Sequence, residues 1–157
     1  DGQHIYPSFV SANNTLGLTE IDAVRATRDF KDVGDWNPHV RSQIAFNVES
    51  KVVETVRTNG VLLVQATPRG GWISGSSAVM KLSGWNWEDA TVLADDGIHL
   101  NWPNSFTRGS RWLGEDTSLK PNDKYAEQIN ELADYINNSK AYILNFSPVI
   151  NFIMIEF

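Results

Sequence analysis

The chain has 157 residues, a formal net charge of −6 at pH 7 and no cysteine. The acidic balance excludes an electrostatic nucleic-acid binder, because such proteins gather basic residues on one face. The absence of cysteine excludes disulfides, thiolate nucleophiles and cysteine-based metal centres. With 41% hydrophobic residues the chain has enough apolar material for a core, so we predict a single domain over residues 1–157.

The first half of the sequence predicts one strand and one well-bounded helix. Residues 5–12 are mostly apolar and predict a largely buried strand. Residues 19–40 predict a loop, with either a short helix or an ordered segment at its start. Ser50 is a suitable N-cap for a helix over residues 51–59, and Gly60 is a suitable residue to end it.

The second half alternates predicted strands and helices. Residues 61–67 form a continuous apolar run, which is typical of a strand covered on both faces. Later turn and cap signals predict strands over residues 78–82 and 97–102 and helices over residues 87–94 and 122–138. The apolar tail over residues 141–157 is too short and too polar for a membrane helix, so we predict no membrane partner. Either this tail folds back as an added strand or two, or two copies of the chain associate through their sheets.

Strands that alternate with helices indicate an α/β fold with a parallel sheet. In such folds ligands approach the carboxyl ends of the strands. We therefore expect functional side chains after Val10, Ala66 and Leu82, or near His99.

Three ordered motifs carry a resemblance to a known family. They are "HIYPSFVSANNTLGLTEIDAVRATRDFKDVGDWNPHVRSQIAFN", "VRTNGVLLVQATPRGGWISGSSAVMKLSGWNWEDA" and "GIHLNWP", and the similarity runs over residues 4–103. The sequence resembles the early part of the amidohydrolase superfamily, in its imidazolonepropionase-like branch. The resemblance implies a hydrolase of carbon–nitrogen bonds on a (β/α)8 barrel, with zinc or another divalent metal that activates water.

The metal ligands that this resemblance implies are missing. In the family the first barrel strand ends in a His-x-His pair, and the aligned positions hold Asn13 and Thr15. An amide and a hydroxyl are weak ligands for zinc, which favours imidazole, thiolate and carboxylate. We therefore predict no metal, no cofactor and no catalytic residue, and a protein that is inactive alone. The alternatives are a non-catalytic small-molecule-binding or scaffolding protein, or one part of an enzyme that another chain completes.

The length also departs from the family, because a complete (β/α)8 barrel takes about 250 residues. We expect a partial barrel-type parallel sheet with flanking helices, incomplete relative to the full barrel, from a piece of a larger enzyme. An open sheet exposes unpaired backbone groups at its edges. We therefore predict a homo-oligomer that forms through these edges. The sequence does not indicate a compartment.

Several side chains are candidates for lining a cleft that binds a small polar ligand, and they are Asn13, Asn14, Gln65, Thr67, Ser74, Ser77 and His99. A hydrogen-bonded structural role is the alternative for His99, and a purely structural loop is the alternative for the glycine-rich residues 68–77. Asp95 and Asp96 are interpreted as a solvated turn.

Overall fold

The computed structural model describes residues 2–153, with side chains up to residue 143. The chain divides into two compact units, Asp1–Asn101 and Trp102–Phe157. The first unit contains β1 (Phe9–Asn14), η1 (Arg25–Thr27), η2 (Ser42–Ala45), α1 (Lys51–Thr58), β2 (Val61–Ala66), β3 (Ile73–Lys81), α2 (Trp87–Ala90) and β4 (Thr91–Leu100). The second contains β5 (Phe106–Arg108), η3 (Arg111–Leu113), β6 (Leu119–Pro121) and α3 (Tyr125–Ile153).

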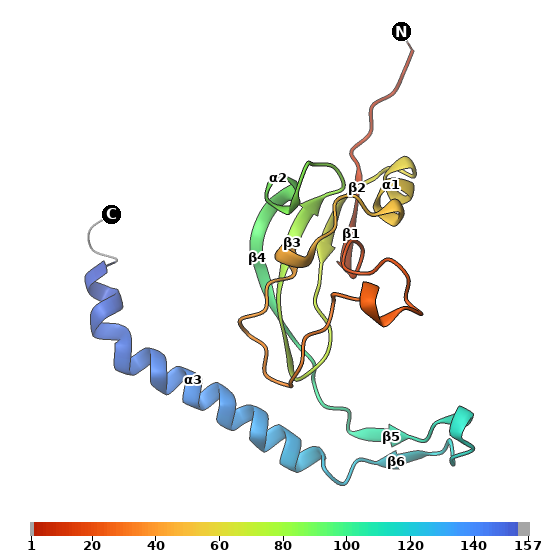
Figure 1. Ribbon diagram of the computed structural model, residues 1–157. Coiled ribbons are helices and arrows are strands. Elements are labelled where there is room, and N and C mark those ends of the chain that lie inside the picture. Colours follow the sequence, from red (N-terminus) through yellow and green to blue (C-terminus); the bar gives the residue numbers. More distant parts are fainter. Residues whose placement is uncertain (1, 154–157) are drawn as a thin grey trace. The chain divides into compact units, whose positions relative to one another are not determined.

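The first unit is built around a mixed sheet of four strands in the order β1-β2-β3-β4 (Figure 1). β1 and β2 are parallel, and the connection between them contains α1. β3 is antiparallel to β2, and β4 is antiparallel to β3. The link from β2 to β3 spans only residues 67–72, which is too short for the crossover that a parallel pair requires. The sheet is therefore not parallel throughout.

The first strand lies at an edge of the sheet and is mostly exposed. It spans Phe9–Asn14, so the strand predicted over residues 5–12 is present but begins four residues later, and the prediction that it is largely buried is wrong. Pro7 has no backbone N–H to donate to a neighbouring strand. β1 also has a single neighbour, β2, which leaves its other edge open.

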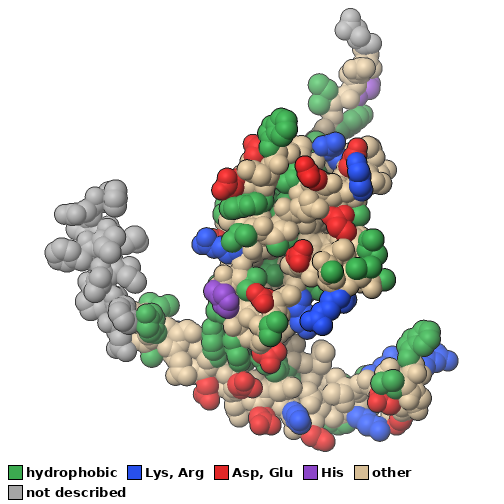
Figure 2. Space-filling view, in the orientation of Figure 1, with side chains coloured by type: hydrophobic (Ala, Val, Ile, Leu, Met, Phe, Trp, Pro, Cys, Tyr) green, Lys and Arg blue, Asp and Glu red, His purple; other side chains and the backbone are tan. Residues whose placement is uncertain are grey.

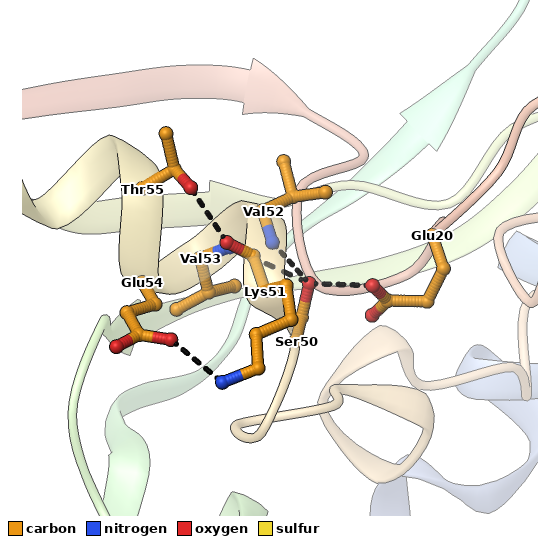
Figure 3. A network of polar contacts seen from close by, with 7 residues as sticks. All are labelled: Glu20, Ser50, Lys51, Val52, Val53, Glu54 and Thr55. Atoms are coloured by element: carbon orange, nitrogen blue, oxygen red, sulfur yellow. Dashed lines mark hydrogen bonds and ion pairs between the residues drawn. The ribbon is translucent and has the colours of Figure 1, made fainter.

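The N-terminus of α1 confirms the predicted cap. The Ser50 hydroxyl accepts hydrogen bonds from the backbone N–H groups of Val52 at 3.2 Å and Val53 at 3.4 Å. It also donates to the Glu20 carboxylate at 2.8 Å (Figure 3). Gly60 follows the helix with a φ of 86°, a conformation that glycine adopts without strain. Two local signals therefore fix both ends of this short helix.

The hydrophobic core lies on one face of the sheet. Val64 and Ala66 of β2 and Ala78 and Met80 of β3 are almost completely buried. They pack with residues from the segments that cover this face, which include Leu18, Phe46 and Val53. Alternate β2 residues such as Gln65 are only half-buried, so the predicted coverage of residues 61–67 on both faces is wrong.

The strands β3 and β4 are longer than the sequence predicted. β3 begins at Ile73, inside the glycine-rich segment predicted as a loop, and β4 begins at Thr91, where a helix was predicted to continue. The Asn86 side chain caps α2 by accepting from the N–H of Asp89 at 2.8 Å. This helix ends after four residues, because the chain then joins the β3–β4 ladder.

The second unit consists of a two-stranded hairpin and a long helix. β5 and β6 pair in antiparallel fashion within a segment predicted only as a polar connection. The helix predicted over residues 122–138 is present as α3, and its backbone continues to Ile153. The strand predicted for the tail is therefore wrong up to that residue, and residues 154–157 lie outside the described residues. In the described part of the chain, no helix combines the length and apolar character needed to cross a membrane.

Candidate functional site at the carboxyl ends of β1 and β2

The end of β1 does not continue as a regular extended strand. Asn13 has a φ of 51°, and the pairing with β2 shifts register between Ser11 and Asn14. Side chains two residues apart share one face only while the backbone stays extended. Asn13 is exposed, whereas Thr15 is half-buried beyond the last residue of the strand. The geometry that would aim two imidazoles from these positions in one direction is therefore interrupted.

The backbone of Asn13 is held from two sides. Its N–H donates to the Gln65 side-chain oxygen at 3.0 Å. Its carbonyl accepts from the Arg69 guanidinium, Nη2, at 2.6 Å. These contacts connect the end of β1 to β2 and to the loop after β2, and they stabilise the left-handed conformation at Asn13. The amide side chain of Asn13 has no partner among the described residues.

The Gln65 side chain extends this network to β4. Its amide nitrogen donates to the Asp96 carboxylate in a short hydrogen bond. The chain of contacts therefore runs from Arg69 through Asn13 and Gln65 to Asp96. We call these four residues the Asn13 network. Asp95 and Asp96 are exposed, as the interpretation as a solvated turn requires, but they lie within β4 and not in a turn.

His99 on β4 lies within the electrostatic reach of this network. Burial lowers the pKa of its imidazole below the ordinary value of 6.5, the Arg69 cation lowers it further, and the Asp96 carboxylate partly opposes both effects. The lowered pKa favours the neutral imidazole, which carries one hydrogen-bond donor and one acceptor.

The other predicted cleft residues use their side chains within the fold. Asn14 donates to the Ser11 hydroxyl at 3.0 Å and accepts from the Leu16 N–H at 2.9 Å, which forms a tight turn after β1. Three buried hydroxyls donate to carbonyls of their own unit, namely Thr67 to Gln65 at 3.2 Å, Ser74 to Gly70 at 2.8 Å and Ser77 to Gly97 at 3.2 Å. Asn13, Gln65 and His99 thus all interact with Arg69, Asp96 or both. The side chains of the remaining candidates form hydrogen bonds within the fold.

Arg69 and Asp96 were missed by the sequence analysis. Arg69 lies three residues after the end of β2. Ligands of α/β folds bind near the carboxyl ends of strands, so this position could have been predicted. Asp96 lies 31 residues from Gln65, and no sequence pattern indicates that contact. The sequence therefore contained a signal for Arg69, its place after a strand, and no signal for Asp96.

Comparisons with known proteins give one informative match. No protein-family model and no curated protein matches the sequence. Among solved structures, the chain is similar to an amidohydrolase from Thermotoga maritima MSB8, with a TM-score of 0.71 and 22% sequence identity. The fold is amidohydrolase-like. The alignment covers 90% of this chain and 36% of that one, so this chain spans about a third of the length of its structural neighbour.

The residues present at the end of β1 do not fit a zinc ion. Asn13 and Thr15 offer a neutral amide and a hydroxyl, and the nearest carboxylate of the network, Asp96, is bonded to Gln65. Within residues 2–153, no three or more His, Asp or Glu side chains form a group that could hold a metal ion. The chemistry that these side chains offer the amidohydrolase-like fold is hydrogen bonding, from an exposed amide, a guanidinium and a neutral imidazole.

Proposed function

We propose that this chain is an amidohydrolase-like protein that binds a small polar ligand at the Asn13 network and does not hydrolyse it alone. The observation that carries the proposal is the interruption of β1 at Asn13, where a neutral side chain on left-handed backbone faces solvent beside Arg69. An amide and a guanidinium recognise carbonyl and carboxylate oxygens by hydrogen bonding. Neither lowers the pKa of water as a bound zinc ion does.

We also propose that the chain derives from the imidazolonepropionase-like branch and that its parallel strands β1 and β2 correspond to the first strands of a (β/α)8 barrel. The support is the order of the motifs from "YPSFVSANNTLGL" to "GIHLNWP". The parallel pairing of β1 with β2, with α1 between them in sequence, is consistent with one strand–helix–strand unit of such a barrel.

A second candidate function is one part of an enzyme that another chain completes. It is favoured by the two open edges of the sheet, at β1 and β4. We propose that these edges pair between copies of the chain, which gives a homo-oligomer. Light scattering after size-exclusion chromatography at micromolar concentration tests this assembly, and a strictly monomeric chain would contradict it.

The binding proposal is tested with hydantoin, a small cyclic amide, as the probe. Calorimetric titration of the purified chain should show binding without turnover, and the variant Asn13→Gly should weaken it. Glycine keeps the left-handed backbone at this position and removes only the amide side chain. Asn138→Ala, in the exposed part of α3, is the matched control. Turnover of hydantoin by the metal-free chain, or equal affinity in Asn13→Gly, would refute the proposal.

A further inference from the structure

A pocket lies along residues 25–35, in the segment between β1 and α1. Its volume is about 530 Å³, which is within the usual range for small-molecule sites. The wall includes the cationic side chains of Arg25, Arg28 and Lys31, the carboxylates of Asp32 and Asp35 and the ring of Phe30. Three cations therefore outnumber two carboxylates in this wall, whereas the whole chain has 13 basic and 19 acidic residues.

The two arginines of this pocket stand on one short turn. Arg25 begins the 3-10 turn η1, and Arg28 is the residue that caps its end. Both side chains line the pocket, so the two guanidinium groups share one wall. Like charges held close together repel each other, and an anion bound between them would relieve this repulsion.

The three cations take part in none of the ion pairs among the residues that the structure describes. Those ion pairs join Arg41 to Asp95, Lys51 to Glu54 and Lys120 to Asp116. The wall also contains the carboxylates of Asp32, which accepts from the neighbouring N–H of Val33 at 2.6 Å, and of Asp35, and neither forms an ion pair with the cations. Arg25, Arg28 and Lys31 therefore keep their donors available for a ligand.

The backbone that carries the pocket is fixed. The Asp29 N–H donates to the Leu18 carbonyl at 2.8 Å, and the Phe30 carbonyl accepts from the Arg69 N–H at 2.7 Å. The stem of Lys31 lies over Gly70, where an added Cβ would come within 2.7 Å of the Lys31 Cε. A frame that is rigid before binding loses little entropy when a ligand binds.

The ring of Phe30 gives the pocket an apolar side. It packs against the core cluster of the first unit, and it also lines an adjoining hollow of about 520 Å³ together with Lys31 and His39. Figure 2 shows that basic side chains on the visible face occur singly and in small groups, without one continuous basic surface. This distribution fits a small anion better than an extended polyanion.

We propose that this pocket binds a small anion whose carboxylate or phosphate oxygens bond to Arg25 and Arg28 and whose apolar part rests on Phe30. Guanidinium groups match the oxygens of both anions in paired hydrogen bonds. Lys31 supplies a third positive charge at the edge of the same site. This site is independent of the Asn13 network, because none of the residues that bind the ligand belongs to that network.

The test is calorimetric titration of the full chain with citrate and, separately, with inorganic phosphate in low-salt buffer. We expect one of the two to bind, and we expect the double variant Arg25→Gln/Arg28→Gln to bind it about tenfold or more weakly, because charge-assisted hydrogen bonds are lost. The control is Lys124→Gln, an exposed cation of the second unit, which should keep the affinity. Tighter binding of citrate would indicate a ligand with carboxylate groups, and tighter binding of phosphate would indicate a ligand with a phosphate group.

Two further measurements test the pocket if the double variant folds poorly. The single variant Lys31→Gln should weaken binding by about threefold, and added salt should weaken binding to the wild-type chain, because screening reduces the attraction of an exposed cation. Failure of the wild-type chain to bind either anion would overturn the proposal. Equal affinity in the wild-type chain and in well-folded variants would overturn it as well.

Discussion

Replacing Ser50 with alanine should destabilise the first unit by about 2 kcal/mol. The Ser50 side chain is 2% exposed and makes three hydrogen bonds at the N-terminus of α1 (Figure 3). Two of them satisfy backbone N–H groups that an α-helix leaves without partners at its start. The third reaches Glu20, in the segment that follows the end of β1. The change therefore loosens both the helix and the segment after Asn13.

The magnitude is the sum of two contributions. Loss of an N-cap by substitution with alanine costs about 1 kcal/mol. A hydrogen bond to a charged acceptor contributes about 1.5–3 kcal/mol when it is buried. Glu20 is half-exposed and keeps its bond from the Asn47 amide at 3.0 Å, so we take about 1 kcal/mol for this contact. For a unit of this size the total corresponds to a decrease in melting temperature of about 10 °C.

Urea denaturation followed by circular dichroism measures the effect as a change in the free energy of unfolding. Thr55→Ala is the matched control, because the Thr55 hydroxyl is exposed and bonds only to the Lys51 carbonyl within the same helix. This control should change stability by less than about 0.5 kcal/mol. Equal stability of Ser50→Ala and Thr55→Ala would refute the assignment of Ser50 as the cap that fixes this region.

Three further predictions follow from single features of the first unit. Asn13→His/Thr15→His should not hold stoichiometric zinc in elemental analysis, because the left-handed backbone at Asn13 interrupts the alternation of side chains. Gly75→Ala should cost at least about 3 kcal/mol in urea denaturation, because its Cβ would lie 2.5 Å from the Val40 carbonyl oxygen. Because the pKa of His99 is below 6.5, stability measured against pH should fall as pH drops below that value, and His99→Gln should lack this decrease.

Local features of the fold were predictable from the sequence. Ser50 and Gly60 bound α1 as expected, since a cap and a left-handed residue act on their immediate neighbours. The start of the helix predicted from residue 87 is fixed in the same way, because the Asn86 side chain caps α2. The length of α2 was not predictable, because pairing of the following residues with β3 ends the helix. Long-range pairing decides where such a segment changes conformation.

The glycine-rich segment shows the same limit. Gly75 and its serine neighbours resemble a loop in composition, yet they form the first half of β3. Gly75 is required there because the Val40 backbone approaches closely, a contact 35 residues away that no local pattern encodes. The candidate site divides in the same way. Asn13 and Gln65 were among the side chains predicted to line a cleft, whereas their link to Asp96 depends on the pairing of β2, β3 and β4.

The central claim is that the end of β1 binds by hydrogen bonding and holds no hydrolytic metal. Equilibrium dialysis of the tag-free full chain against zinc, followed by elemental analysis, tests it directly. We expect substoichiometric zinc that is the same in the wild-type chain and in Asn13→Gly. Stoichiometric zinc that survives dialysis into buffer and is lost in Asn13→Gly would contradict the account.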